Sequence, residues 1–187
     1  LVIEFTGDNQ AEVEAGIASL ERLVAREHLA CTLRPLRDAR PQADVWYVRK
    51  IGLNVLASIR SDFKPISVVE DVAVPVDLLP VYIERLRAIF AQHNTEGAFY
   101  AHASAGVLHV RPLINLKTMD GLRAMQDIGR QAFALCHELG GAMTGEHGDG
   151  FERSHWNRGL FGEDVYAAFV AVKRAFDPRG LLNPNKK

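Results

Sequence analysis

The segment AFYAHASAGVLHVRP, residues 98–112, decides the fold of this chain. Two runs rich in strand-forming residues, 98–103 and 107–112, flank a turn at Ala105 and Gly106, which is the pattern of a β-hairpin. A hairpin joins antiparallel strands, and the helices expected elsewhere are too few for a doubly wound parallel sheet. We therefore expect an α+β fold in which helices cover a largely antiparallel sheet, with ferredoxin-like split β-α-β units.

Outward from the hairpin, apolar spacing predicts the remaining elements. The other strands are expected at 1–6, 29–33 and 66–74. The helices are expected at 10–27, 45–59, 78–92, 118–139 and 163–176, where apolar residues recur at helical spacing. The adjacent acids Glu70 and Asp71 interrupt an otherwise β-branched strand, and Gly140 suits the C-terminal cap of a helix.

The composition excludes several classes of protein. Apolar residues make up 48% of the 187 residues, charged residues 24%, and the formal net charge is −1, which is ordinary for a soluble globular chain of one or two domains. No basic run occurs, so we expect no nucleic-acid partner. No apolar run approaches the roughly 20 residues of a membrane span, so we expect no transmembrane segment.

The cysteines and the first residues bear on the setting of the chain. Cys31 and Cys136 lie far apart without metal-binding or redox spacing, which argues for a reducing compartment. We therefore expect a cytoplasmic protein, either free in solution or peripheral to the membrane. The chain opens on the strand-like run LVIEF, which we interpret as the start of an excised domain.

Two histidines flank the expected hairpin turn. With the turn at Ala105 and Gly106, His102 lies directly opposite His109, and their Cβ atoms are about 4.5–5.5 Å apart on one face. Two imidazoles at that spacing can hold a metal ion, and a carboxylate from elsewhere can complete the three protein ligands of a catalytic zinc site. A four-residue loop with the same pairing is an equal alternative. For the pair alone, solvated surface histidines are the plainer interpretation.

A second polar stretch, TGEHGDG at 144–150, holds three glycines, two carboxylates and a histidine. Glycine permits close backbone approaches. The carboxylate of Glu146 beside the imidazole of His147 supplies a metal ligand, a general base or both. Two rare polar constellations in one small chain are more easily explained by one shared site. We therefore expect this loop to meet the hairpin histidines.

Three motifs together resemble those of one family. HASAGVLH at 102–109, GEHGDG at 145–150 and FDPRGLLNP at 176–184 follow one another as in FAD-linked oxidases. Over its whole length the chain is similar to the C-terminal domain of the D-lactate, glycolate and D-2-hydroxyglutarate dehydrogenase family. The resemblance implies that residues 1–187 are a substrate-binding cap domain. It also implies an N-terminal FAD-binding domain in the same protein, absent from this chain.

The same resemblance implies an activity and the residues that carry it. A small D-2-hydroxy acid would be oxidised to the 2-oxo acid while hydride passes to FAD; no electron acceptor is assigned. A divalent metal, zinc or manganese, would be held by His102, His109 and Glu146 and would orient the substrate. His147 would act as the base, and Asn183 would contact the flavin. This fragment alone is expected to be inactive.

Cationic side chains are the candidates for binding substrate carboxylates. Arg49 resembles the arginine of the family helix that binds substrate, and arginine matches a carboxylate bidentately. Lys64 is a second candidate. Arg111 stands where many family members have asparagine, and an extra cation there would suit a diacid. The chain also has SAGV between its histidines where family members often have GDGN.

Two other classes of function compete with this interpretation. One is a self-contained metal-dependent hydrolase that uses His102, His109 and Glu146 as ligands and His147 as base, which would be active without flavin. The other is a non-catalytic binding module in which the polar loop is structural. Metal content of the purified protein separates this module from both metal-dependent enzymes.

Overall fold

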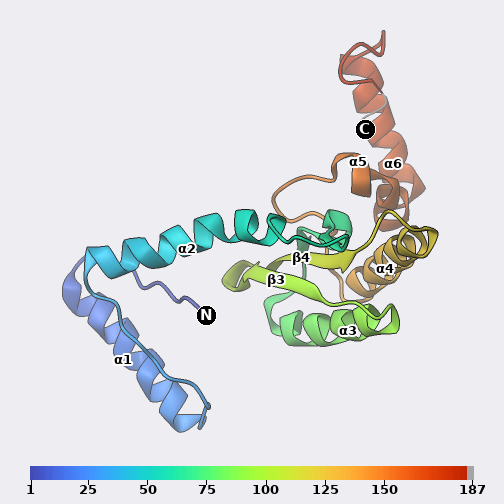
Figure 1. Cartoon of the computed structure of the whole chain (residues 1–187). Coiled ribbons are helices and arrows are strands. Elements are labelled where there is room, and N and C mark those ends of the chain that lie inside the picture. The colour runs from blue at the N-terminus through green and yellow to red at the C-terminus, as the bar shows by residue number, and fades with distance from the viewer. Residues whose placement is uncertain (185–187) are drawn as a thin grey trace. The chain divides into compact units, whose positions relative to one another are not determined.

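The computed structural model of the chain describes residues 1–184 and divides into two compact units, Leu1–Leu53 and Asn54–Lys187 (Figure 1). The first unit holds α1 (Gln10–Arg26) and most of α2 (Ala39–Ala57). The side chain of Asn9 caps α1 by accepting a hydrogen bond from the Glu12 amide, which satisfies one of the unpaired N–H groups of the first turn.

The expected strands at 1–6 and 29–33 do not form among the described residues. Both segments stay largely exposed, with Leu1, Val2 and Leu29 more than half accessible. Phe5 packs instead against α1 at Gly16, where an added Cβ would lie 2.6 Å from the Phe5 ring. A strand needs a ladder partner for its backbone groups, and the first unit supplies helices.

The second unit is built on a sheet whose central strand is β4 (Val107–Ile114). β3 (Gly97–His102) pairs antiparallel with one edge of β4. β1 (Lys64–Pro65) and β2 (Val72–Ala73) pair with the other edge, one after the other along it. The single strand expected at 66–74 is therefore interrupted, because the 3₁₀ helix Ser67–Val69 leaves the ladder and buries Val68 and Val69 in the core.

The helices of the second unit complete a ferredoxin-like arrangement. α3 (Leu79–Gln92) connects β2 to β3, which run parallel on either side of β4, and this is a split β-α-β unit. After α4 (Met119–Glu138), Ala142 forms an antiparallel bridge with Ala73 at the outer edge of β2. The α+β class and the split β-α-β units are confirmed. In the second unit, the strand that would follow α4 is reduced to the bridge at Ala142.

The two faces of β4 carry different kinds of side chain. Leu108 and Val110 are fully buried on the face that packs against α3 and α4, which lie side by side beside the hairpin in Figure 1. The helices contribute buried side chains to the same core, among them Tyr82, Leu86, Ile128, Ala132 and Cys136. Side chains alternate along a strand, so His109 and Arg111 leave β4 on the opposite face.

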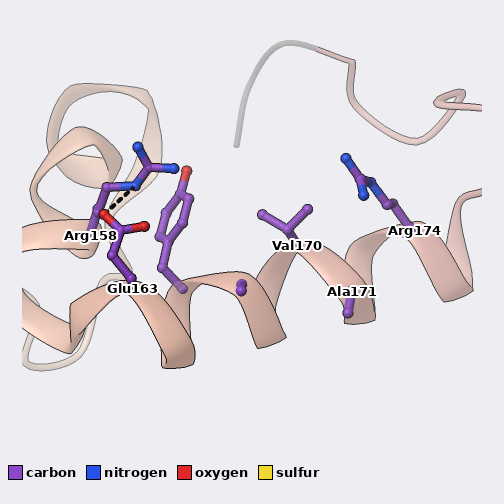
Figure 2. A pocket seen from close by; sticks show the side chains of 7 residues that line it. Arg158, Glu163, Val170, Ala171 and Arg174 are labelled. Atoms are coloured by element: carbon purple, nitrogen blue, oxygen red, sulfur yellow. Dashed lines mark ion pairs between the residues drawn. The ribbon is translucent and has the colours of Figure 1, made fainter.

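The chain ends in helices that carry few buried groups. α5 (Gly150–Arg153) follows the glycine loop, and α6 (Asn157–Phe176) begins six residues before the expected start. Gly162 breaks α6 with a left-handed φ of 79°. A groove of about 270 Å³ lies along α6. Figure 2 shows side chains that line it, among them Arg158, Val170 and Arg174. No helix within residues 1–184 is both long enough and apolar enough to cross a membrane.

Candidate active site

The histidines of the hairpin share a face but are not directly opposed. His109 lies opposite Tyr100, and His102 lies opposite Val107. The expected 102:109 pairing is wrong by two residues. A shift of two keeps every side chain on its face, whereas a shift of one would exchange the faces. The rings of His102 and His109 therefore still approach, with centroids 5.4 Å apart and planes nearly perpendicular.

The hairpin turn explains the shift. Residues Ala103–Ala105 form a 3₁₀ turn and Gly106 follows in the left-handed region at φ 73°, so the connection takes four residues and the two-residue turn is not formed. The Gly106 carbonyl accepts a hydrogen bond from the Val74 amide at 3.0 Å. A Cβ on Gly106 would lie 2.1 Å from the Val74 carbonyl oxygen. The turn thus packs backbone to backbone against the end of β2.

One carboxylate oxygen stands at the centre of the histidines. Glu146 Oε1 lies 2.9 Å from His109 Nε2, 3.2 Å from His102 Nε2 and 3.6 Å from His147 Nε2. The hairpin and the glycine loop therefore meet, as the sequence predicts. Ligand atoms bound tetrahedrally to one zinc ion lie roughly 3.3 Å apart, so the two shorter distances suit a shared cation.

His109 is the buried member of this group. Its side chain is 1% exposed, and neither ring nitrogen makes a well-directed hydrogen bond within the described part of the chain. Burial lowers the pKa of His109, and the neighbouring His147 lowers it further, while Glu146 and Asp71 act in the opposite direction. The lowered pKa favours the neutral imidazole, which is the form that binds a metal ion, and Nε2 lies 2.9 Å from the Glu146 carboxylate, so the residues present fit a divalent cation.

His147 lies beside this group with a different geometry. Its ring stacks on that of His109, with centroids 4.8 Å apart and planes 17° apart, and its side chain is 47% exposed. The ring therefore faces the open side of the site, where a bound molecule would be reached. Tyr100 covers the other side of His109 at 4.5 Å between centroids.

Asp71 is a member of the site whose role the sequence does not reveal. Its carboxylate is fully buried and accepts hydrogen bonds from the Thr144 hydroxyl and the backbone N–H groups of Gly145, Glu146 and His147, at 2.8–3.2 Å. Burial alone would raise the pKa of Asp71. The hydrogen bonds from the amides of His147 and Glu146 outweigh burial, so the pKa lies below its usual value.

A buried arginine supports the same corner. Arg153 donates from one terminal nitrogen to the Glu70 carbonyl and from the other to the Gly148 carbonyl at 2.6 Å. The glycine loop is thus fastened on both sides of Glu146 and His147. The adjacent acids Glu70 and Asp71 within a β-branched run are the feature of the sequence that points to this corner.

Asp71, His109, Glu146 and His147 each offer a ligand atom, and these atoms lie within 4.8 Å of one another. Asp71 is the poorest ligand among them, because Oδ2 already accepts from four donors and a carboxylate oxygen has about two lone-pair directions. His102 is not a member of this group, but its Nε2 lies 3.2 Å from Glu146 Oε1. Glu146 and His109 belong both to this group and to the predicted set of His102, His109 and Glu146.

The candidate substrate cations are placed differently. Arg111 leaves β4 on the histidine face and pairs with the buried carboxylate of Glu70. Lys64 lies opposite Ile114, five residues along β4 from His109, and its Nζ donates to the Ile59 carbonyl at 2.6 Å. The structure brings Arg111 to the site's face but leaves Lys64 at the far end of the sheet. Both roles stay predictions.

The last two predicted residues are Arg49 and Asn183. Arg49 belongs to the first unit, where its guanidinium is 5.7 Å from the centre of the Trp46 ring. Asn183 adopts a left-handed φ of 50° directly after a loop that Asp177 closes by accepting from the amides of Leu181 and Leu182. Their roles in binding substrate and flavin stay predictions.

Comparisons with known proteins bear on the whole chain. The family model described as FAD linked oxidases, C-terminal domain, matches residues 1–187. A D-2-hydroxyglutarate dehydrogenase of Escherichia coli (strain K12) is 35% identical over 191 residues, covering 99% of this chain and 19% of that protein. The glycolate oxidase subunit GlcD of the same strain is 31% identical over 157 residues, covering 84% of this chain and 31% of GlcD. The chain spans about a fifth of the length of the dehydrogenases that it matches.

Proposed function

The chain belongs to the family of C-terminal domains of FAD-linked oxidases, and on that premise we propose that it is the substrate domain of a flavoprotein that oxidises a D-2-hydroxy acid to the 2-oxo acid. An N-terminal FAD-binding domain would complete the protein. Relatives named D-2-hydroxyglutarate dehydrogenase and glycolate oxidase subunit support this class of substrate, since both names specify a 2-hydroxy acid.

One observation carries the proposal. The side chains of His102, His109 and His147 converge on the Oε1 atom of Glu146, with the longest of the three distances at 3.6 Å. These residues come from a hairpin and a loop that are about forty positions apart in the sequence. A structural loop has no need of three imidazoles at one carboxylate, whereas a site that binds a cation and moves a proton does.

The residues of the site would have two roles, metal binding and proton transfer. His102, His109 and Glu146 would hold zinc or manganese, which supplies Lewis-acid polarisation of the substrate hydroxyl when bound. His147 would accept the hydroxyl proton at Nε2, because this nitrogen faces Glu146 and its ring is half exposed. The flavin would supply the hydride acceptor, and Asn183 would contact it.

Arg111 would orient the substrate through a carboxylate. It lies two residues from His109 on the same face of β4, with its charge shared with Glu70. A guanidinium has five N–H donors, so a contact to Glu70 leaves donors for a second carboxylate. Arg49 and Lys64 would bind substrate in the complete protein.

The test is anaerobic reduction of the flavin in the complete, flavin-loaded protein by matched pairs of D- and L-2-hydroxy acids. We expect the D-enantiomers to bleach the flavin absorbance and the L-enantiomers to fail. His147→Asn should retain bound metal but slow bleaching by about 10²–10⁴-fold, the usual contribution of a positioned base. Glu146→Gln should lose both metal, measured by elemental analysis, and turnover.

Glu84→Gln is the matched control, because Glu84 is an exposed carboxylate on α3, in the helical layer away from the histidine face. It should behave as the unmodified protein. Absence of flavin reduction by every 2-hydroxy acid, or full metal content and turnover in Glu146→Gln, would contradict the proposal.

A further inference from the structure

Two of the predicted side chains of the site are only partly held by packing. Those of Glu146 and His147 are 45% and 47% exposed, so the surrounding core does not fix their directions. What is buried is the acceptor of their backbone amides, the carboxylate of Asp71. We propose that Asp71 is a positioning residue, which holds the backbone of residues 144–147 so that the Glu146 carboxylate and the His147 ring face His102 and His109.

The hydrogen bonds define one orientation of the loop. Three successive N–H groups and the Thr144 hydroxyl point at a single carboxylate, whose Oδ1 and Oδ2 both accept from the Glu146 amide. Hydrogen bonds to an ionised acceptor are about twice as strong as neutral ones. If the peptide of Glu146 rotated so that its side chain pointed elsewhere, the Glu146 N–H would lose its hydrogen bond to the buried, charged Asp71 carboxylate.

The backbone that carries this carboxylate is held by further hydrogen bonds. Asp71 stands between the buried Val69 and strand β2, and its own carbonyl accepts from the Gly145 amide at 2.7 Å. Arg153 holds the neighbouring Glu70 carbonyl on one side and the Gly148 carbonyl on the other. Asp71 therefore connects the loop at residues 144–147 to the edge of the sheet at β2.

The backbone at Asp71 points to a specific requirement. Its φ is 74°, in the left-handed region that asparagine, aspartate and glycine adopt more readily than other residues. Asp71→Asn and Asp71→Gly can therefore keep this conformation while removing the charge or the whole side chain. These two variants separate the hydrogen-bonding role from backbone strain.

The proposal rests on the proposed function, and its test uses the complete, flavin-loaded protein. We expect Asp71→Asn to weaken Mn²⁺ binding, measured by electron paramagnetic resonance titration, by about 10–100-fold and to lower kcat by a similar factor, the usual effect of removing a partner behind a ligand. Hydrogen exchange should show faster exchange at the amides of 145–147 while the amides of α3 and α4 stay protected.

Rescue by a small anion gives the sharper readout. Asp71→Gly leaves a space facing the four donors, and formate carries the missing carboxylate. Formate should restore Mn²⁺ affinity and turnover to Asp71→Gly, whereas formamide, its neutral counterpart, should not. Asp127→Asn is the control, because the half-buried Asp127 on α4 pairs with His93 and accepts from Arg130 and Gln131, and it should stay within about twofold of the unmodified protein.

The outcomes separate this proposal from the function it rests on. Mn²⁺ affinity and kcat within twofold of the unmodified protein in both Asp71 variants, while Glu146→Gln loses both, would overturn the positioning role and leave the proposed function standing. If Asp71→Asn does not fold, Thr144→Val removes one donor to Oδ2. A severalfold loss of Mn²⁺ affinity in this variant supports the proposal, and an unchanged affinity overturns it.

Discussion

At the scale of single residues, Gly106 shows how one backbone position sets the geometry of the histidine hairpin. Its left-handed φ and its close approach to Val74 leave no room for a side chain. We expect Gly106→Ala to lower the free energy of unfolding by more than about 3 kcal/mol, because a left-handed alanine costs about 1–2 kcal/mol and the clash adds to it. Urea unfolding followed by circular dichroism measures the loss.

Gly140→Ala is the matched comparison. Gly140 also has a left-handed φ, of 68°, but no atom lies within 4 Å of the position its Cβ would take. This variant should lose only the about 1–2 kcal/mol of the backbone conformation. Equal losses for the two alanine variants would show that the contact between Gly106 and Val74 contributes nothing.

A site can be recognised from the sequence when the side chains that do its chemistry are themselves of unusual types. His102, His109 and Glu146 stand out in the sequence because imidazoles and carboxylates in glycine-rich surroundings have few structural uses. Asp71 acts through backbone amides that are more than seventy positions away, and no spacing in the sequence records such a contact. Its importance becomes visible only when the loop is in place.

At the scale of elements, the loop after α6 depends on one carboxylate. Asp177 accepts from Lys173 and from the amides of Leu181 and Leu182, and the Lys173 hydrogen bond, followed by those two amides, holds the pKa of Asp177 below its usual value despite burial. A lowered folded-state pKa stabilises the loop fully above about pH 4. That stability is lost as the pH falls through the folded-state pKa.

We therefore expect the amide chemical shifts of Leu181 and Leu182 to titrate together with a midpoint below about pH 3.9. Nuclear magnetic resonance of the labelled chain measures this midpoint. Asp177→Asn should abolish the transition and leave both amides at shifted positions. A midpoint at or above the ordinary value of aspartate would show that the hydrogen bonds of this loop are not maintained in solution.

The elements differ in how far the sequence determines them. α3 and α4 agree with prediction to within a residue or two, since their apolar faces repeat over several turns. The run 66–74 has strong strand propensity, but burial of Val68 and Val69 outweighs propensity and breaks the ladder. Short apolar runs at 1–6 and 29–33 predict strands only if partners exist, and no local pattern shows whether they do.

At the scale of the whole molecule, α6 carries an apolar stripe on its exposed surface. Its members are all more than 40% exposed, and those after the break at Gly162 recur at helical spacing: Phe161, Val165, Phe169, Val172 and Phe176. Contiguous exposed apolar surface of this kind favours association. We expect this 187-residue chain to bind a hydrophobic dye and to self-associate with rising concentration, measured by fluorescence and analytical ultracentrifugation.

The double variant Phe161→Ser with Phe169→Ser should reduce both signals while the free energy of unfolding changes by about 0.5 kcal/mol or less per site, as is usual for exposed positions. Ala168→Ser, at an exposed position between them, is the control and should change neither signal. Unaltered dye binding in the double variant would assign the apolar surface to another part of the chain.

The alternation along β4, with Leu108 and Val110 turned to the helices and His109 and Arg111 turned away, restricts how this hairpin can change in length. A single residue inserted between Val107 and Leu108 would turn the imidazole of His109 into the hydrophobic core and turn Leu108 out of it. Changes in the number of residues within the paired part of β4 before His109 are therefore restricted to even steps, unless a bulge absorbs the odd residue.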